Sequence, residues 1–230
     1  ELSMNRLFIM ILAFVIPLHA HENVTQKMAK QEFIQGVDLS ELAEIEDHGG
    51  TFKENGLAED ALQMFKDHGL NFVRLRIWHT PVSGYNDLDK TLLVARRIHS
   101  LGLKFLLDFH YSDTWADPGH QQKPAAWENV PFQALKDSVY QYTRHVITAL
   151  NDQNTPPDIV QIGNEIICGL LWDDGRVCDQ HNTLQKWAQL AELINQGVRG
   201  IKESIDPGDS VKIMIHIDRG GDNAGSQWFF

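Results

Sequence analysis

The chain has 230 residues, of which 43% are hydrophobic and 22% are charged, and its formal net charge is −11. This composition is that of an ordinary globular protein and excludes a disordered or low-complexity chain. The acidic balance, without any basic run, argues against a nucleic acid or an anionic membrane as a partner. Two cysteines are too few for a disulfide scaffold. No apolar run reaches the roughly 18 residues that a membrane-spanning helix needs.

The first 20 residues have the pattern of a secretory signal peptide. A basic start at Met4–Arg6 is followed by an apolar run that ends at Leu18, and a polar segment begins after Ala20. A positive start, a short apolar core and a small residue before a polar segment are typical of a cleaved leader. We expect translation to start at Met4 and residues 1–20 to be removed on export to the extracellular space or periplasm. The alternative is a buried core helix.

Strand-like and helix-like segments alternate along residues 21–230, which we expect to form one domain. The strand-like segments are Phe33–Ser40, Asn71–Trp78, Lys104–Tyr111, Asp158–Glu165 and Val211–Asp218. The helix-like segments are Leu57–His68, Asp87–Leu101, Phe132–Leu150 and Leu184–Ile205. The chain then ends on the apolar residues Trp228–Phe230, with no predicted helix to cover them. Five strands separated by four helices predict parallel βαβ units.

The alternation of side chains along these strands distinguishes an open sheet from a barrel. Successive strand residues point to opposite faces. One face is aliphatic, as with Val73, Leu75 and Ile77, whereas the other becomes polar toward the carboxyl end of each strand. A doubly wound sheet carries helices on both faces, so both faces would be apolar. We therefore predict an α/β fold, a (β/α)8 TIM barrel of which only about the first five strands are present, with polar groups converging at its mouth.

The polar groups at the strand ends favour chemistry on sugars. The ionisable candidates are Asp38, Arg76, Asp108, His110, Glu165, His216 and Asp218. The tryptophans near them are Trp78, Trp115, Trp127 and Trp172. Carboxyl groups supply the acid and base of glycoside hydrolysis, and indole rings stack on the apolar face of a sugar. Each residue also has a structural interpretation, since a strand-end Asp can cap a loop and a Trp can lie in the core. Arg74 lies deeper than Arg76 and is expected to pair with a buried carboxylate such as Asp108.

A metal-dependent hydrolase is the main alternative for the same residues. Such sites gather several histidines and carboxylates around one or two ions. The chain has 11 histidines, but it has no His-x-His pair on the first strand and no His-Glu-x-x-His helix. We therefore expect no metal ion in the site and no cofactor requirement for the chemistry.

Four segments carry a resemblance to a known family. They are VRLRIWHTP (Val73–Pro81), LLDFHYSDTWADPGHQQKPAAW (Leu106–Trp127), PDIVQIGNEI (Pro157–Ile166) and GLLWDDG (Gly169–Gly175). In this order they resemble glycoside hydrolase family 53, the arabinogalactan endo-β-1,4-galactanases, and the similarity extends from about Phe33 to Phe230. The Asn-Glu pair stands at the end of the fourth strand, as in the large clan of retaining (β/α)8 glycosidases. A mannanase or cellulase of that clan would share Asn-Glu but not the HYSDTWADPG segment.

The resemblance implies a role for individual residues. Glu165 matches the general acid/base, which protonates the departing glycosidic oxygen and later activates water. Asn164 matches the residue that hydrogen-bonds the sugar 2-hydroxyl, and Arg76 matches the arginine that supports the carboxylates electrostatically. The residues expected to line the substrate groove are Trp78, Asp108, His110, Asp113, Trp115, Trp172, His216 and Asp218. The implied partner is galactan or arabinogalactan, with no nucleic acid and no membrane contact after the signal is removed.

The second carboxylate of the reaction is the main departure from the family. A retaining mechanism needs a nucleophile about 5–5.5 Å from the acid, and in this family that glutamate ends the seventh strand. Since only five strands are predicted, we expect a fragment that lacks the nucleophile and any structural calcium site of the late loops. Glu128, Glu192 and Glu203 cannot replace it, because they fall in a loop and on an outer helix. An unclosed barrel leaves two sheet edges, so we expect the fragment alone to be inactive and to aggregate or stay partly unfolded.

Two questions stay open on the sequence alone. The complete protein is either a secreted endo-acting galactanase with a retaining two-carboxylate mechanism, or a non-catalytic sugar-binding or inert remnant of such an enzyme. Cys168 and Cys178 either form a disulfide that braces the loop of Trp172, as an oxidising compartment would allow, or remain two unrelated thiols.

Overall fold

The structure is a computed structural model that describes residues 33–205, 208 and 210–230. The predicted signal peptide, residues 1–20, lies outside the described residues, as does the beginning of the predicted domain. The unit Ile34–Phe230 is compact and contains all the elements described below.

Five parallel strands form the central sheet of this unit. They are β1 (Gly36–Asp38), β4 (Phe72–Ile77), β5 (Lys104–Phe109), β6 (Ile159–Ile162) and β9 (Lys212–Met214). Each strand pairs with the next along the chain, and the register places Arg76 beside Asp108 and Asp108 beside Gln161. A sequential parallel order is that of a barrel segment, whereas a doubly wound sheet reverses its order at a switch point. The predicted partial α/β barrel is confirmed.

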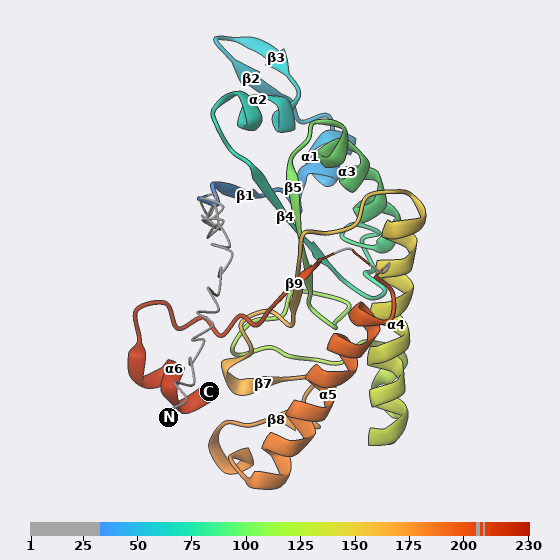
Figure 1. The fold of residues 1–230 in the computed structure, drawn as a ribbon, viewed down its shortest axis with the longest axis vertical. Coiled ribbons are helices and arrows are strands. Elements are labelled where there is room, and N and C mark those ends of the chain that lie inside the picture. The colour runs from blue at the N-terminus through green and yellow to red at the C-terminus, as the bar shows by residue number, and fades with distance from the viewer. Residues whose placement is uncertain (1–32, 206–207, 209) are drawn as a thin grey trace, which may run out of the picture. The chain divides into compact units, whose positions relative to one another are not determined.

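Helices follow the strands, and the long ones cover one side of the sheet, whereas the last short helix lies apart from them at the lower left (Figure 1). They are α1 (Leu42–Asp47), α2 (Ala61–Asp67), α3 (Leu88–Ser100), α4 (Phe132–Asp152), α5 (Leu184–Lys202) and α6 (Asn223–Phe229). The long helices α4 and α5 pack against each other. The side chains of Asp60, Asp87 and Thr183 accept N–H bonds of 3.0, 2.8 and 3.3 Å at the starts of α2, α3 and α5. These caps satisfy backbone donors that have no partner within the helix.

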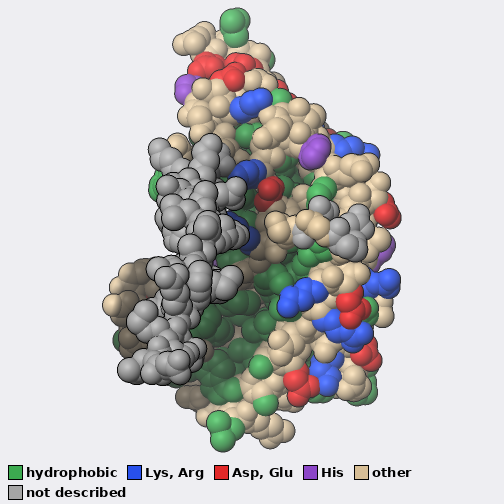
Figure 2. Space-filling view, viewed as in Figure 1, with side chains coloured by type: hydrophobic (Ala, Val, Ile, Leu, Met, Phe, Trp, Pro, Cys, Tyr) green, Lys and Arg blue, Asp and Glu red, His purple; other side chains and the backbone are tan. Residues whose placement is uncertain are grey.

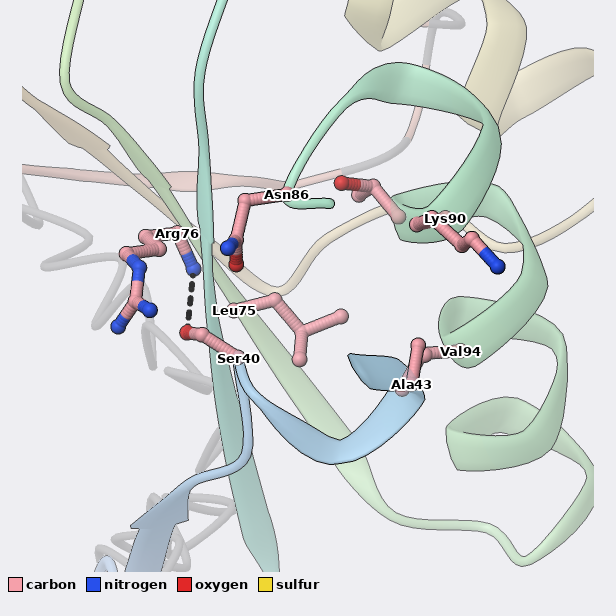
Figure 3. Close-up of a pocket in the computed structure, with 8 residues that line it drawn as sticks. Ser40, Ala43, Leu75, Arg76, Asn86, Lys90 and Val94 are labelled. Atoms are coloured by element: carbon pink, nitrogen blue, oxygen red, sulfur yellow. Dashed lines mark hydrogen bonds between the residues drawn. The ribbon is translucent and has the colours of Figure 1, made fainter. Parts of the chain in front are cut away.

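Side-chain alternation on β4 separates the core from the inner face of the sheet. Leu75 is buried and points toward Ala43 of α1 and Val94 of α3, whereas the guanidinium of Arg76 points to the other side of the strand (Figure 3). The cavity between α1, β4 and α3 measures about 10 Å³, room for about one water molecule. The aliphatic face therefore packs under the helices, as predicted, and the polar side chains turn inward.

Two short hairpins and three 3₁₀ turns complete the unit. One hairpin joins β2 (Phe52–Glu54) to β3 (Leu57–Glu59), and the other joins β7 (Gly169–Leu170) to β8 (Gly175–Arg176). The 3₁₀ turns are η1 (Ala125–Trp127), η2 (Ile166–Cys168) and η3 (Asp179–His181). The second hairpin and η2 directly follow the fourth parallel strand, so they shape the loop after Glu165.

The structure differs from the sequence prediction at several element boundaries, among them the shorter strands β1 and β9. The helix expected at Leu57–His68 begins only at Ala61, because Leu57–Glu59 forms β3 and Asp60 caps the helix. The strand expected at Asp158–Glu165 ends at Ile162, where residues with positive φ begin. The apolar end forms the helix α6, whose Trp228 and Phe229 lie 5.2 and 5.5 Å from Trp187 of α5, measured between ring centroids. Trp228 and Phe230 nevertheless remain exposed.

The inner face of the sheet is hollow near β1, β4 and β5. The hollow measures about 230 Å³, and the residues that line it are Ile34, Gly36, Val37, Asp38, Phe72, Arg74 and Leu106.

In Figure 2, hydrophobic side chains gather in the middle of the view, while charged side chains are spread over α4 and α5 at the right. The outer surfaces of the long helices are thus polar, as expected for helices that cover a sheet on one side only.

Candidate active site

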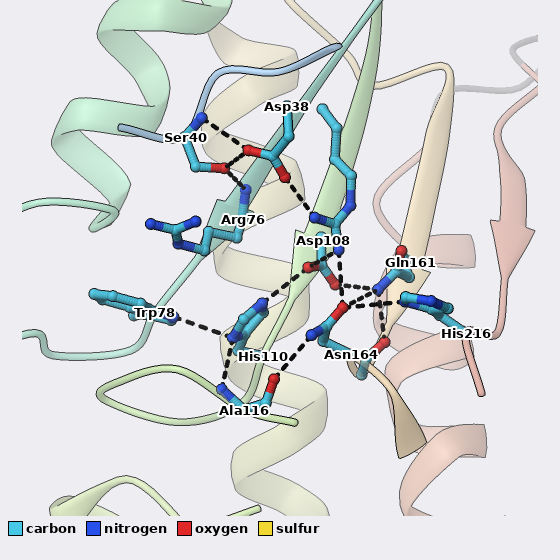
Figure 4. Close-up of polar contacts among 12 residues, drawn as sticks. Asp38, Ser40, Arg76, Trp78, Asp108, His110, Ala116, Gln161, Asn164 and His216 are labelled. Atoms are coloured by element: carbon cyan, nitrogen blue, oxygen red, sulfur yellow. Dashed lines mark hydrogen bonds and ion pairs between the residues drawn. The ribbon is translucent and has the colours of Figure 1, made fainter. Parts of the chain in front are cut away.

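Polar side chains converge at the carboxyl ends of the parallel strands. Asp38 ends β1, Asp108 lies near the end of β5, and Asn164 follows β6 (Figure 4). Arg74 of β4 contacts all three of them. The carboxyl ends of parallel strands meet at one edge, which is where barrel enzymes build their active sites.

Arg74 is the centre of this network. One terminal nitrogen, Nη1, donates to Asp38 Oδ2 at 2.5 Å, and Nη2 donates to Asp108 Oδ2 at 2.6 Å and to Asn164 Oδ1 at 2.9 Å. The carboxylate of Asp108 is fully buried, so it needs a cationic partner. The predicted pairing of Arg74 with Asp108 is confirmed.

Asp38 is held in its charged form. Ser40 donates to Asp38 Oδ1 from its backbone nitrogen at 3.0 Å and from its hydroxyl at 2.5 Å. Burial is the largest influence and raises the pKa of Asp38, but the hydrogen bonds from Ser40 and the charge of Arg74 together outweigh it. The pKa of Asp38 therefore lies below its usual value. The Ser40 hydroxyl also accepts a bond of 2.9 Å from the backbone nitrogen of Arg76, which ties the end of β1 to β4.

Arg76 lies between two tryptophans. Its guanidinium carbon is 5.1 Å from the ring centroid of Trp78 and 4.7 Å from that of Trp115, both within cation–π range. Arg76 also pairs with Glu41. Burial lowers the pKa of Arg76, and the charges of Asp38 and Asp108 partly offset this effect. Since Trp115 is 45% exposed, Arg76 supports an indole ring that is accessible to a ligand.

His110 is fixed in one tautomer by its neighbours. Its Nδ1 accepts two N–H bonds, from Trp78 Nε1 at 3.2 Å and from the backbone of Ala116 at 3.0 Å. The proton must therefore be on Nε2, which lies 2.9 Å from Asp108 Oδ2 and donates to it. Both His110 and Asp108 are buried. The pair therefore contributes to the site by fixing the positions of neighbouring side chains.

Asn164 is 3% exposed and its amide orientation is determined by four contacts. The oxygen Oδ1 accepts from Arg74 at 2.9 Å, from His216 Nδ1 at 3.1 Å and from Gln161 Nε2 at 3.3 Å. The nitrogen Nδ2 donates to the carbonyl of Ala116 at 2.8 Å. Within the described residues this contact uses one of the two N–H groups of the amide.

Glu165 follows in the left-handed conformation, with φ 53° and ψ 47°. Its side chain is half-buried. Among the residues that the structure describes, none makes a hydrogen bond or ion pair with its carboxylate. A carboxyl group that is partly shielded and unpaired is suited to act on an oxygen of a bound ligand.

The structure also describes the surroundings of two further residues predicted to line the groove. Asp113 accepts backbone N–H bonds from Thr80 at 2.8 Å and from Ala125 at 2.9 Å, one on each carboxylate oxygen. It therefore holds two loops together. Asp218 has a left-handed backbone with φ 53°, and its Oδ1 is buried without a hydrogen-bond partner among the described residues.

A disulfide joins Cys168 to Cys178 across 4.9 Å between the two Cα atoms. The loop that it closes contains Trp172, whose Nε1 donates to the carbonyl of Cys168 at 3.0 Å. The guanidinium carbon of Arg176 lies 4.3 Å from the centroid of the Trp172 ring. The disulfide thus braces the loop that presents this indole, close in sequence to Glu165.

Two buried glutamines belong to the site although the sequence prediction does not include them. Gln161 donates from Nε2 to Asp108 Oδ1 at 2.5 Å, and Gln121 donates from Nε2 to the carbonyl of Asn164 at 2.8 Å. Each carried a signal: Gln161 stands on the polar side of its strand, and Gln121 lies in the most specific sequence segment. A neutral amide supplies neither the acid nor the base of glycoside hydrolysis, so a search for acid and base groups did not select these glutamines.

The metal-dependent alternative requires a group of side chains that can bind an ion. Within residues 33–205, 208 and 210–230, no group of three or more His, Cys, Asp or Glu side chains is arranged to hold an ion.

Comparisons with known proteins point to one family. The model of glycosyl hydrolase family 53 matches residues 34–230. A protein of Niallia circulans described as an uncharacterized protein in the bgaB 5′ region is 48% identical over 205 residues, 88% of this chain and 55% of that protein. The arabinogalactan endo-β-1,4-galactanase of Thermothelomyces thermophilus is 39% identical over 198 residues, 85% of this chain and 57% of that protein.

A solved structure, from a study of two fungal β-1,4-galactanases, superposes with a TM-score of 0.78 at 38% identity. It covers 85% of this chain, which in turn covers 57% of that structure. The chain therefore spans somewhat more than half the length of the relatives that it matches. The match to the family model covers nearly all of the described residues, and so the chain belongs to glycosyl hydrolase family 53.

Proposed function

We propose that the complete protein is a secreted, endo-acting galactanase that cleaves β-1,4-galactosidic bonds of galactan and arabinogalactan. The observation that carries this proposal is the pair Asn164 and Glu165 at the carboxyl end of β6. Asn164 is fixed by its neighbours, and Glu165 is unpaired among the described residues. The relative from Thermothelomyces thermophilus, which is named as an arabinogalactan endo-β-1,4-galactanase, supports the choice of substrate.

Glu165 acts as the general acid/base in this proposal. It donates a proton to the glycosidic oxygen as that bond breaks, and it later takes a proton from the water that releases the sugar. The second N–H of Asn164 donates to the hydroxyl next to the reacting carbon. Trp115 and Trp172 offer indole faces to the sugar rings.

Asp108, His110 and Arg74 act as positioning residues. Asp108 is fully buried and accepts from Arg74, His110 and Gln161. It is therefore a fixed anchor beneath Asn164 rather than a group that contacts the sugar.

The retaining mechanism requires a second carboxylate, which we assign to the part of the family's length that this chain does not span. Two acidic residues, one on α5 and one at its C-terminal end, are engaged elsewhere. Glu192 pairs with Lys136 at 2.6 Å, and Glu203 pairs with Arg199 at 2.8 Å. These contacts support the expectation that the nucleophile lies beyond the five strands.

Export is part of the proposal. The pattern of residues 1–20 is that of a signal peptide, and the Cys168–Cys178 disulfide is of a kind that persists in oxidising compartments. None of the described helices is both long and apolar enough to cross a membrane.

The test uses the complete protein, which is the protein expressed from its complete reading frame. We expect the complete protein to release oligosaccharides from β-1,4-galactan. The variant Glu165→Gln should have a kcat/KM that is lower by about 100-fold to 10⁴-fold, the range that one acid/base group contributes. Glu192→Gln, which changes a carboxylate on α5, serves as the matched control. A complete protein that binds galactan without cleaving it would establish the non-catalytic alternative instead.

A further inference from the structure

Glu165 adopts a backbone conformation that a glutamate does not prefer. Its φ of 53° and ψ of 47° lie in the left-handed region, which is unfavourable for a residue with a side chain. Such a conformation persists only where surrounding contacts determine it. Because the backbone sets the direction of the Glu165 side chain, those contacts also set where the acid points.

The peptide groups on both sides of Glu165 are pinned by hydrogen bonds. The preceding carbonyl, that of Asn164, accepts from Gln121 Nε2 at 2.8 Å. The following nitrogen, that of Ile166, donates to the carbonyl of His216 at 2.8 Å. The second bond is made by main-chain atoms alone. The first depends on a side chain, and it is therefore the one that a substitution can remove.

Gln121 is well placed to hold its partner. It is 1% exposed, and its Nε2 also donates to the carbonyl of Asp117 at 3.0 Å. The opposite amide orientation would bring Oε1 against two carbonyl oxygens, so these acceptors fix which atom is the nitrogen. The backbone carbonyl of Gln121 accepts from Trp172 at 2.8 Å. One residue thus connects the Asp117 turn, the peptide before Glu165 and the loop of Trp172.

We propose that Gln121 is a positioning residue that holds the acid/base Glu165 in its left-handed conformation through the carbonyl of Asn164. This inference rests on the proposed function of Glu165. Since Gln121 is buried, its loss is expected to affect the proton transfer more than the binding of substrate.

The first experiment compares Gln121→Met with Gln122→Met in the complete protein. Methionine keeps the length of the side chain but donates no hydrogen bond, and Gln122 is the exposed neighbour. We expect Gln121→Met to lose about 10- to 100-fold in kcat on galactan, the range that a misplaced catalytic group produces. Its KM should stay within about threefold of the unmodified value, which corresponds to less than about 0.7 kcal/mol of binding energy. Gln122→Met should keep both constants.

A substrate with a good leaving group separates positioning of the acid from a general structural defect. A dinitrophenolate departs without being protonated, so kcat/KM for dinitrophenyl β-galactobioside no longer needs the acid. We expect the defect of Gln121→Met to shrink to within about threefold on this substrate, and Glu165→Gln should behave in the same way. An equal loss on both substrates, or a loss on galactan no larger than that of Gln122→Met, would overturn the inference.

Gln121→Glu provides a second, independent readout and replaces Gln121→Met if that variant does not fold. A protonated glutamic acid can still donate to the carbonyl of Asn164, whereas the ionised form cannot and places its charge against carbonyl oxygens. Activity of Gln121→Glu should therefore be close to normal in acid and fall as the pH rises. Asp117, His120 and Lys123 also titrate nearby, and they are present in both Gln121→Glu and Gln122→Glu. Comparing the pH profiles of these two variants therefore removes the contribution of the three residues. Identical profiles for the two variants would contradict the inference, whereas an unmodified complete protein that is inactive on galactan would instead refute the proposed function.

Discussion

Arg74 and Asp108 form an ion pair of 2.6 Å in which the carboxylate has no exposure and the guanidinium side chain is 24% exposed. The pair crosses from β4 to β5 and continues to Asp38 and Asn164. A buried carboxylate is costly without its cation, because the charge has lost its hydration. The network therefore fixes the relative positions of three strand ends, and with them the residue that precedes Glu165.

Replacing Arg74 by methionine is expected to destabilise the complete protein by about 3–5 kcal/mol, the cost of leaving one partner of a buried pair uncompensated. Urea unfolding measures this change. Arg96→Met on the exposed side of α3 is the control, and it should change stability by no more than about 0.5 kcal/mol. Equal effects of the two substitutions would show that Asp108 does not depend on Arg74.

The disulfide gives a prediction that is independent of the ionic network. Cys168 and Cys178 are separated by 10 residues, and closing a loop of this size stabilises a fold by about 2–4 kcal/mol. The Cys168→Ser, Cys178→Ser double variant should therefore have a lower Tm than the oxidised protein. A reductant should lower the Tm of the unmodified protein and leave that of the double variant unchanged. A reductant that also lowers the Tm of the double variant would point to another cause.

The sequence predicted the parts of this site that depend on periodicity. Alternation along the strands placed Leu75 under the helices and Arg74 opposite it, where it reaches Asp108. The chain order of the strands followed from the regular return of helical segments. These features were accessible because each depends on residues close together in the sequence.

Other features depend on contacts between distant segments and could not be read from local patterns. The guanidinium of Arg76 interacts with the charges of Asp38 and Asp108, but its position between Trp78 and Trp115 was not predicted. Gln121 donates to the carbonyl of Asn164, which is 43 residues away in the sequence. No local pattern around a glutamine predicts such a contact. The short hairpin strand at Leu57–Glu59 was missed because three residues are too few to show a period of two.

The ionisation of Asp38 predicts a dependence of stability on pH. The hydrogen bonds from Ser40 and the charge of Arg74 outweigh burial and hold the folded-state pKa of Asp38 below its usual value. A carboxylate of this kind contributes stability that is complete above the unfolded-state pKa of about 3.9 and is lost as the pH falls through the folded-state pKa.

The free energy of unfolding should consequently fall less steeply between about pH 5 and pH 2 in Asp38→Asn than in the unmodified protein. Ser40→Ala removes the hydroxyl that donates to Asp38 at 2.5 Å, so it should reduce the slope in part. Urea unfolding at a series of pH values measures both effects. Parallel curves for the unmodified protein and Asp38→Asn would rule out a contribution from this carboxylate.

Alanine substitutions at Gly163 and Gly69 separate two effects on stability: the packing around Glu165 and the strain of the backbone. Both have positive φ, 78° and 87°, so an alanine at either position carries a backbone penalty of roughly 1–2 kcal/mol. A Cβ on Gly69 would meet no atom within 4 Å, whereas one on Gly163 would lie 2.5 Å from Ile166 Cγ2. Gly163→Ala should therefore lose about 1–3 kcal/mol more than Gly69→Ala, the usual cost of overpacking.

The clash at Gly163 also has a functional consequence, because Ile166 directly follows Glu165. To accept the extra methyl group, Ile166 must shift, and the peptide between Glu165 and Ile166 must shift with it. Gly163→Ala is thus expected to lower kcat/KM on galactan by about 10-fold or more, while Gly69→Ala keeps the unmodified value. Measuring both variants at a temperature where each is fully folded separates the two effects. If Gly163→Ala is destabilised but fully active, the segment from Gly163 to Ile166 can move without moving the acid, and the position of Glu165 must be fixed by other contacts.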